Sequence, residues 1–215
     1  MYIPLVFRED RPEHLSALMR ENALATLVTL GPGGLMASHI PLIYESVPDS
    51  LGILHGHVAR ANKQWQEVRP EVEALAIFHG PEAYVSPTWY PSRQQTGRVV
   101  PTWNYAVVHA YGRLETYSDA GRLRKHLALL TTTFEAGFTS PWTLDEAPKE
   151  FIDGLMEGIV GIDIHITRLE GKCKVSQNRS AEDRAGAVQG LLGLGDPESA
   201  AIAHLACEHA PKQCP

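Results

Sequence analysis

The sequence has few cysteines and no long apolar run. Its three cysteines, Cys173, Cys207 and Cys214, are odd in number and widely spaced, which argues against a disulfide framework. No stretch approaches the roughly eighteen apolar residues that a membrane-spanning helix needs. The N-terminus, MYIPLVFRED, lacks the basic segment and apolar stretch of a signal peptide. We therefore expect a cytoplasmic protein that does not use a membrane.

A long basic stripe is also missing. Lys and Arg number 19 against 25 Asp and Glu, so the formal net charge is −6 at pH 7. Nucleic-acid-binding domains usually carry a basic face, because neutralising phosphates supplies much of their affinity. The best local candidates are Arg122, Arg124 and Lys125, but Leu123 and Leu127 tie their expected helix to the core. We expect direct sequence-specific DNA binding by the isolated chain to be weak or absent.

Common metal, nucleotide and DNA-binding motifs are absent. There are ten histidines, yet no HExxH arrangement and no closely spaced cysteine pair, so we expect no metal site. His55, His57 and His79 could gather from neighbouring strands, but scattered histidines more often make ordinary hydrogen bonds. The GPGG at 31–34 predicts a hairpin turn, because no helix follows it. The later expected helices are separated by longer linkers or strands, without the tight turn of a helix-turn-helix.

Short strand-like runs separated by turn residues dominate the first half of the chain. The expected strands are 25–30, 35–44, 52–58, 74–78, 83–87, 105–117 and 160–169. The expected helices are 10–22, 61–68, 119–135, 149–159, 180–192 and 197–207. About six or seven short strands with surrounding helices predict a mainly β protein, a barrel with peripheral helices, in one compact unit.

A first polar segment joins SHIP at 38–41 to GHVARAN at 56–62. Arg60 and Asn62 stand at the start of the expected helix 61–68, whose free N–H groups and positive dipole end suit a phosphate. Arg60 would add a bidentate donor fork, and His57 could add another contact. The alternative is that Asn62 only caps the helix and Arg60 is solvated.

Two further segments are unusually polar or aromatic. Residues 83–105 hold two tryptophans and three tyrosines among Pro, Thr, Ser and Asn. Aromatic walls with a few polar groups are typical of ligand pockets, although a core or interface cluster uses the same residue types. Residues 170–179, EGKCKVSQNR, are too polar for a core. They fit a solvated loop, or a site where Ser176, Gln177 and Asn178 bond a polar ring edge.

Together these motifs resemble the PaiB-like family. MYIP, GHVARAN, AYVSPTWYP, VPTWNY, VGIDIHITRLEGK and SQNR occur in that family's order, from residue 1 to about residue 192. Its members are FMN-binding split barrels, often named negative transcriptional regulators. They are related to pyridoxine-phosphate-oxidase-like flavoproteins, in which a dimer holds FMN at its interface. The resemblance implies a split-barrel domain over 1–192, a helical tail over 193–215, FMN as cofactor and a homodimer.

The resemblance also implies which residues contact FMN. The candidates are Ser38, His39, Ile40, His57, Arg60, Asn62, Trp103, Asn104, Lys174, Gln177 and Asn178. In the family, the first three would follow the isoalloxazine edge and the next three would bind the phosphate. Trp103 and Asn104 would approach the flavin from the partner subunit, and the last three would close the site. Cys173 and Arg93 depart from the family pattern, which has tryptophan and lysine there.

Three functions remain open. The first is an FMN-binding negative transcriptional regulator that acts through its flavin or through a regulatory protein partner. The second is an FMN-dependent oxidoreductase on a small substrate, and the third, less favoured, is a haem-binding split barrel. No residue is an obvious catalytic acid or base, so catalytic residues and enzymatic activity stay unassigned. The cofactor would carry any chemistry.

Overall fold

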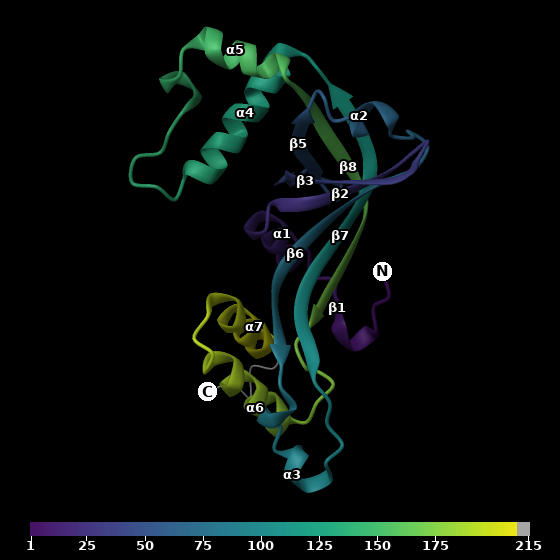
Figure 1. The fold of residues 1–215 in the computed structure, drawn as a ribbon, viewed down its shortest axis with the longest axis vertical. Helices are drawn as coiled ribbons and strands as arrows, with labels where there is room; N and C mark the ends of the chain where they lie inside the picture. The colour runs from purple at the N-terminus through teal and green to yellow at the C-terminus, as the bar shows by residue number, and fades with distance from the viewer. Residues whose placement is uncertain (210–215) are drawn as a thin grey trace. The chain divides into compact units, whose positions relative to one another are not determined.

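A computed structural model describes residues 1–209, and Figure 1 traces their secondary structure. The chain forms two compact units, each built from separate segments. Unit 1 contains Met1–Glu21, His79–Val108 and the chain from Glu170 onward, and unit 2 contains Asn22–Phe78 and His109–Leu169. Cys214 and the end of the expected tail 193–215 lie outside the described residues. The boundary after residue 192 stays a prediction, although the helix beyond it packs into unit 1.

The fold is a mainly antiparallel sheet with helices around it, of the split-barrel type. Within residues 1–209 the strands are β1 (Arg8–Glu9), β2 (Leu24–Gly31), β3 (Gly34–Pro41), β4 (Ile43–Glu45), β5 (Ile53–Ala59), β6 (Ala74–Val85), β7 (Thr102–Tyr117) and β8 (Ile159–Lys174). Seven of them follow the order β3-β2-β6-β7-β8-β5-β4, and β1 pairs with β8. These eight strands exceed the expected six or seven, because no local pattern indicates the two-residue β1.

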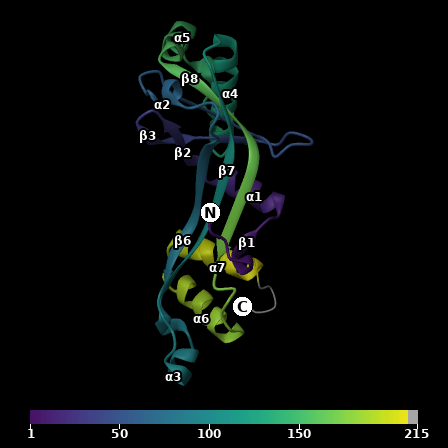
Figure 2. The ribbon, with the colours of Figure 1, turned by 90° about the vertical axis from the view of Figure 1, so that its right-hand side faces the viewer.

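The α-helices of the described chain are α1 (Pro12–Glu21), α2 (Gln64–Glu67), α3 (Ser92–Thr96), α4 (Ala120–Glu135), α5 (Lys149–Glu157), α6 (Ala181–Leu192) and α7 (Pro197–Glu208). Within unit 2, α4 and α5 lie side by side, and within unit 1, α6 and α7 do (Figures 1 and 2). Asp119, Ser180 and Asp196 cap α4, α6 and α7 by accepting a hydrogen bond from a backbone N–H of the first turn.

Unit 2 holds the strands on which the first candidate residues lie. Strands β2 and β3 form a hairpin in which Leu27 pairs with Ser38 and Thr26 with His39. Its turn needs a glycine at Gly34, where φ is 112°. Strand β5 pairs with β8, so that His57 lies opposite Gly161. The alternating burial of β5 follows from the period of two along a strand.

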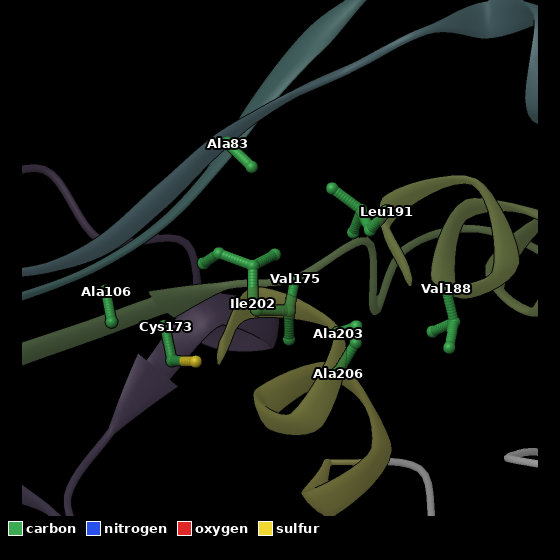
Figure 3. Close-up of a cluster of buried hydrophobic side chains, with 9 residues drawn as sticks. All are labelled: Ala83, Ala106, Cys173, Val175, Val188, Leu191, Ile202, Ala203 and Ala206. Carbon is green, nitrogen blue, oxygen red and sulfur yellow. The ribbon is translucent and has the colours of Figure 1, made fainter. Parts of the chain in front are cut away.

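Unit 1 has its own apolar core, in which helices α6 and α7 pack against strand residues. Figure 3 shows this cluster: Ala83, Ala106, Cys173, Val175, Val188, Leu191, Ile202, Ala203 and Ala206. Leu191 and Ile202 are fully buried there. Small residues on the strands leave room for these larger helix side chains. The core of unit 1 therefore depends on the two last helices.

Four expectations about local structure need correction. Expected strands 74–78 and 83–87 are one strand, β6, in which Gly80 is not a break but allows close approach to the Ala106 carbonyl. Expected strand 35–44 is interrupted at Leu42 between β3 and β4. The expected helix 61–68 is reduced to the four residues of α2. Helices α6 and α7 are joined by only Gly193–Asp196, so the expected absence of a tight turn is wrong.

Two findings bear on the cysteines and on membranes. Cys173 is a buried free thiol, whereas Cys207 is disulfide-bonded, which the cysteine count did not predict. Burial raises the pKa of the Cys173 thiol to about 12, so this side chain is an unreactive core residue. No helix among the described residues is both long and apolar enough to cross a membrane.

Candidate functional site

Unit 2 contains a hollow of about 490 Å³ between the end of β3 and the end of β5. Five of the predicted FMN contacts line it: Ser38, His39, Ile40, His57 and Asn62. Pro41, Val58, Ala59 and Ile159 complete the lining. The two halves of the first polar segment are therefore brought together. Apolar walls with a few placed polar groups, at this volume, are typical of small-molecule sites.

Close packing of β3 against β5 forms the floor of this hollow. A Cβ atom on Gly56 would lie 2.6 Å from Leu42 Cδ2 and 3.0 Å from the Pro41 carbonyl oxygen. Any side chain at position 56 would therefore push the two segments apart. The glycine of the GHVARAN motif thus has a packing reason, which fixes the distance between the two walls of the hollow.

Asn62 connects the two walls. Its Nδ2 donates to Ser38 Oγ at 2.9 Å, while its Oδ1 accepts from the Gln64 backbone N–H at 3.0 Å. Asn62 stands one residue before Lys63, the N-cap of α2, so it bonds the first N–H of this helix without being its N-cap, and it also contacts the β3 wall. Because α2 has only one turn and Asn62 already accepts one of its N–H groups, the expected phosphate site at a helix N-terminus is not formed by α2.

Arg60 is the one predicted FMN contact of this segment that does not line the hollow. Its Nε donates to the Glu157 carbonyl at 2.6 Å and its Nη2 to the Ile159 carbonyl at 2.8 Å. These carbonyls follow the end of α5, where cations are favoured by the helix dipole. Ile159 itself lines the hollow. Arg60 therefore supports the wall of the hollow, and its charge is held beside that wall.

His57 is held from inside unit 2 by a second histidine. Its Nδ1 lies 2.9 Å from Nε2 of His126, on helix α4. His126 is 5% exposed, and its Nδ1 is buried without a hydrogen-bond partner. Burial lowers the pKa of His57, and burial together with the nearby His57 and His55 lowers the pKa of His126 to about 4. Both imidazoles are therefore neutral at pH 7.

His55 lies two residues earlier on the same face of β5, and its surroundings favour the protonated form. Its Nδ1 donates to Asp163 at 2.8 Å and its Nε2 to Glu45 at 2.7 Å. The hydrogen bond to Asp163 raises the pKa of His55 despite its burial. Arg122 Nη2 also donates to Asp163 at 2.6 Å. His55 is therefore part of an ion-pair network, and of these two histidines of β5 it is His57 that lines the hollow.

The other predicted contacts gather in unit 1, where most of their polar groups bond within the unit. Asn104 is 1% exposed and exchanges hydrogen bonds with Ser176. Gln177 bonds the Cys173 carbonyl and the Val175 N–H. Lys174 donates to Thr102 and to the Trp103 carbonyl. These groups shape the end of β8.

Two of the unit 1 candidates are exposed, Trp103 and Asn178. The Trp103 side chain is 53% exposed and makes an edge-to-face pair with Tyr84, with the ring centroids 6.0 Å apart. Such a large exposed aromatic pair is available for a ligand or a partner surface. Arg93, one of the two departures from the family pattern, lies on α3 in the same unit.

The candidate DNA-binding arginines are already paired. Arg122 donates to Glu115 at 2.8 Å and to Asp163, and Arg124 lies 3.5 Å from Asp145 and 3.6 Å from Asp153. The α6–α7 pair has the short connection of a helix-turn-helix, but α7 contains no Lys or Arg and carries two glutamates. A recognition helix needs cations for phosphate contacts. Helix α7 therefore lacks such cations, and the expectation on DNA binding stays a prediction.

Sequence reasoning missed several residues of this site. His126 and Ile159 are 69 and 102 positions from His57 along the chain, and the sequence placed them only in the expected helices 119–135 and 149–159. A histidine on the apolar face of α4, next to Leu123, was the available signal. No group of three or more His, Cys, Asp or Glu that could hold a metal ion occurs among residues 1–209.

Comparisons with known proteins bear on the fold and on the family. Solved structures of flavin-binding proteins share the fold: the flavocytochrome Anf3 from Azotobacter vinelandii, with a TM-score of 0.52 and 16% identity, covers 79% of this chain and 69% of that one. A FAD- and haem-binding protein from Mycobacterium smegmatis gives a TM-score of 0.53 at 19% identity, over 82% of this chain and 78% of that one. At these identities the likeness concerns the fold, a split barrel.

The family follows from the sequence comparisons. Residues 1–168 match the family described as "Putative FMN-binding domain". The protein named protease synthase and sporulation protein PAI 2, from Bacillus subtilis, is 32% identical over 213 residues, which are 99% of this chain and 100% of that protein. The chain therefore belongs to this PaiB-like family of FMN-binding split-barrel proteins, and its cofactor is FMN.

The residues of the hollow fit FMN. Ile40, Val58 and Ile159 supply apolar wall for a flat ring system, and Ser38, His57 and Asn62 supply hydrogen-bonding groups for its polar edge or phosphate. Behind His57, the Nδ1 of His126 is buried and has no hydrogen-bond partner. Bound FMN would supply redox chemistry, while these side chains would bind and orient it.

Proposed function

We propose that the hollow between β3 and β5 is the FMN site of this chain. The observation that carries the proposal is that five predicted contacts, from two stretches separated in sequence, line one cavity of about 490 Å³. Arg60 would add positive charge next to Ile159, at the phosphate end of the cofactor. The polar groups of Ser38, His57 and Asn62 would orient the flavin between the apolar side chains.

The test is a flavin titration of the purified protein. We expect FMN to bind, and riboflavin, which lacks the phosphate, to bind more weakly. Absorbance bands near roughly 370 and 450 nm would report the flavin, a property of the cofactor itself. An intense band near roughly 400 nm in the purified protein would favour haem instead. Absence of any flavin binding would contradict the proposal.

We further propose that the protein works as a homodimer, with exposed residues of a second copy completing the flavin site. Exposed large apolar side chains of unit 1 support this, namely Tyr84, Val100 and Trp103. Soluble monomers seldom leave contiguous apolar patches uncovered. Trp103 is the candidate that a partner would offer. A monomer in light scattering at micromolar concentration that still carries full FMN would contradict this arrangement.

The biological role we propose is negative gene regulation exerted through the flavin or a protein partner, in the cytoplasm. The name of the PAI 2 relative, which refers to protease synthesis and sporulation, supports a regulatory role. Paired arginines on α4 and the lack of cations on α7 support regulation without direct operator binding. Tight gel-shift binding to its own promoter at about 150 mM salt, lost in an R122A/R124A double variant, would contradict this. Steady flavin-dependent turnover of a reductant would favour the oxidoreductase alternative.

A further inference from the structure

The bond between His57 and His126 contains one proton, and two arrangements can place it. Either His126 Nε2–H donates to His57 Nδ1, or His57 Nδ1–H donates to His126 Nε2. A neutral imidazole carries a proton on only one of its nitrogens. The choice therefore also fixes the proton on the far nitrogen of each ring, at Nδ1 of His126 and at Nε2 of His57.

The buried Nδ1 of His126 decides between the two arrangements. In the second arrangement this atom would carry a hydrogen, and a buried N–H donor would be left without an acceptor. In the first arrangement it is only a lone pair. Orphaned buried N–H groups are rarer in proteins than under-satisfied acceptors. Because Nδ1 of His126 is buried and unpartnered, its proton belongs on Nε2.

We propose that His126 is a positioning residue that holds His57 in the tautomer with its proton on Nε2, so that His57 donates a hydrogen bond to an acceptor atom of the flavin. This inference rests on the proposed FMN site. His57 lines the hollow, its Nδ1 is occupied by His126, and Nε2 is its remaining polar atom. An oxidised flavin presents ring carbonyls, two unprotonated ring nitrogens and phosphate oxygens as acceptors, whereas its N3–H donates. The site would therefore favour ligands with an acceptor at this position.

The surroundings keep the pair uncharged. Burial lowers the pKa of both rings, and the nearby His57 and His55 lower the pKa of His126 further. Asp163 faces the same cluster from β8, but His55 and Arg122 already satisfy it. A proton on Nδ1 of His57 would also move the proton of His126 to its buried Nδ1, where it has no acceptor. The pair therefore behaves as a fixed donor toward the hollow.

The first test needs no variant. Imidazole nitrogen NMR of the full chain, free of FMN, reports which nitrogen of each ring carries the proton. We expect His57 and His126 each to show one neutral tautomer, protonated at Nε2. A His126 protonated at Nδ1, or a mixture of tautomers at His57, would overturn the inference. Addition of FMN should then shift the His57 Nε2–H signal.

The second test uses matched variants in an FMN titration. H57F should weaken FMN by about threefold to tenfold, the range for one hydrogen bond. H126Q, whose amide nitrogen can replace Nε2 as a donor, should retain FMN affinity and the His57 tautomer. H126F should lose the fixed tautomer, and its FMN affinity should fall as in H57F. Equal behaviour of folded H126Q and H126F would overturn the inference. A chain that binds no FMN contradicts the proposed function, whereas FMN binding that leaves the His57 signal unmoved contradicts only this donor.

Discussion

Two buried polar clusters, one in each unit, are built on opposite principles. In unit 1, Glu9 is paired with Arg11, and His209 Nε2 lies 3.1 Å from the same carboxylate. Through these contacts the Glu9 carboxylate links β1 to Arg11, just before α1, and to His209, just after α7. In unit 2, His57 and His126 are uncharged, and one nitrogen stays without a partner.

The difference indicates which cluster serves structure and which serves the ligand. A buried charge is tolerated only when it is paired, so the Glu9 cluster acts inside the protein. A neutral donor that faces a hollow can still donate a hydrogen bond to a ligand that enters it. Substitutions in unit 1 are therefore expected to change the free energy of unfolding, and substitutions at the hollow of unit 2 to change flavin affinity. The predictions below separate these two sensitivities.

The largest effect is expected in the core of unit 1. L191A removes a fully buried side chain from the cluster in Figure 3 and should lower the free energy of unfolding by about 2–5 kcal/mol. Urea unfolding measures this. The control is L194A, at a side chain that is 56% exposed, which should change stability by less than about 0.5 kcal/mol. A strong loss of FMN affinity in folded L191A would break the comparison.

A smaller, pH-dependent effect is expected at Glu9. Burial alone would raise its pKa, but the hydrogen bonds and charge of Arg11 outweigh it and lower the pKa to about 2, from an ordinary value of 4.5. Ionised Glu9 therefore stabilises the fold above pH 4.5, and this contribution is lost as the pH falls toward 2. E9Q should cost about 1.5–3 kcal/mol at pH 7. Its stability should converge with that of the parent in acid, and the exposed E21Q control should change little.

The smallest effect concerns Arg60. R60A should weaken FMN by about tenfold and riboflavin much less, if the guanidinium reaches the phosphate. R60K keeps the charge but loses the fork that binds two carbonyls, and should be intermediate. Isothermal titration with both ligands gives the comparison. Equal losses for FMN and riboflavin would mean that Arg60 only supports the wall.

Local patterns predicted most helices and strands, because apolar periodicity and capping residues act within a few positions. The expected helices 119–135 and 180–192 differ from α4 and α6 by one residue at their starts. The break expected near Gly80 failed because that glycine answers to a neighbouring strand, which the local sequence does not contain. Where a strand continues or ends because of packing against a distant segment, local patterns cannot predict it.

The candidate site was predictable in its composition but not in its arrangement. The motif GHVARAN and the segment 38–41 pointed to residues that do line one hollow. The partner that orients His57 comes from a distant segment, since His126 lies on α4. Polarity indicated that Asn104 and Gln177 were unusual, yet their bonds turned out to be local to unit 1.

Filling the hollow tests the central claim most directly. Ser38 faces the hollow from β3, and S38Y would place a phenol in the space that FMN is proposed to occupy. The matched control is A37Y, at an exposed neighbour on the same strand. Fluorescence titration should show FMN binding weakened by more than about tenfold in S38Y and retained in A37Y. FMN affinity equal to that of the parent in a folded S38Y variant would contradict the assignment of this hollow as the flavin site.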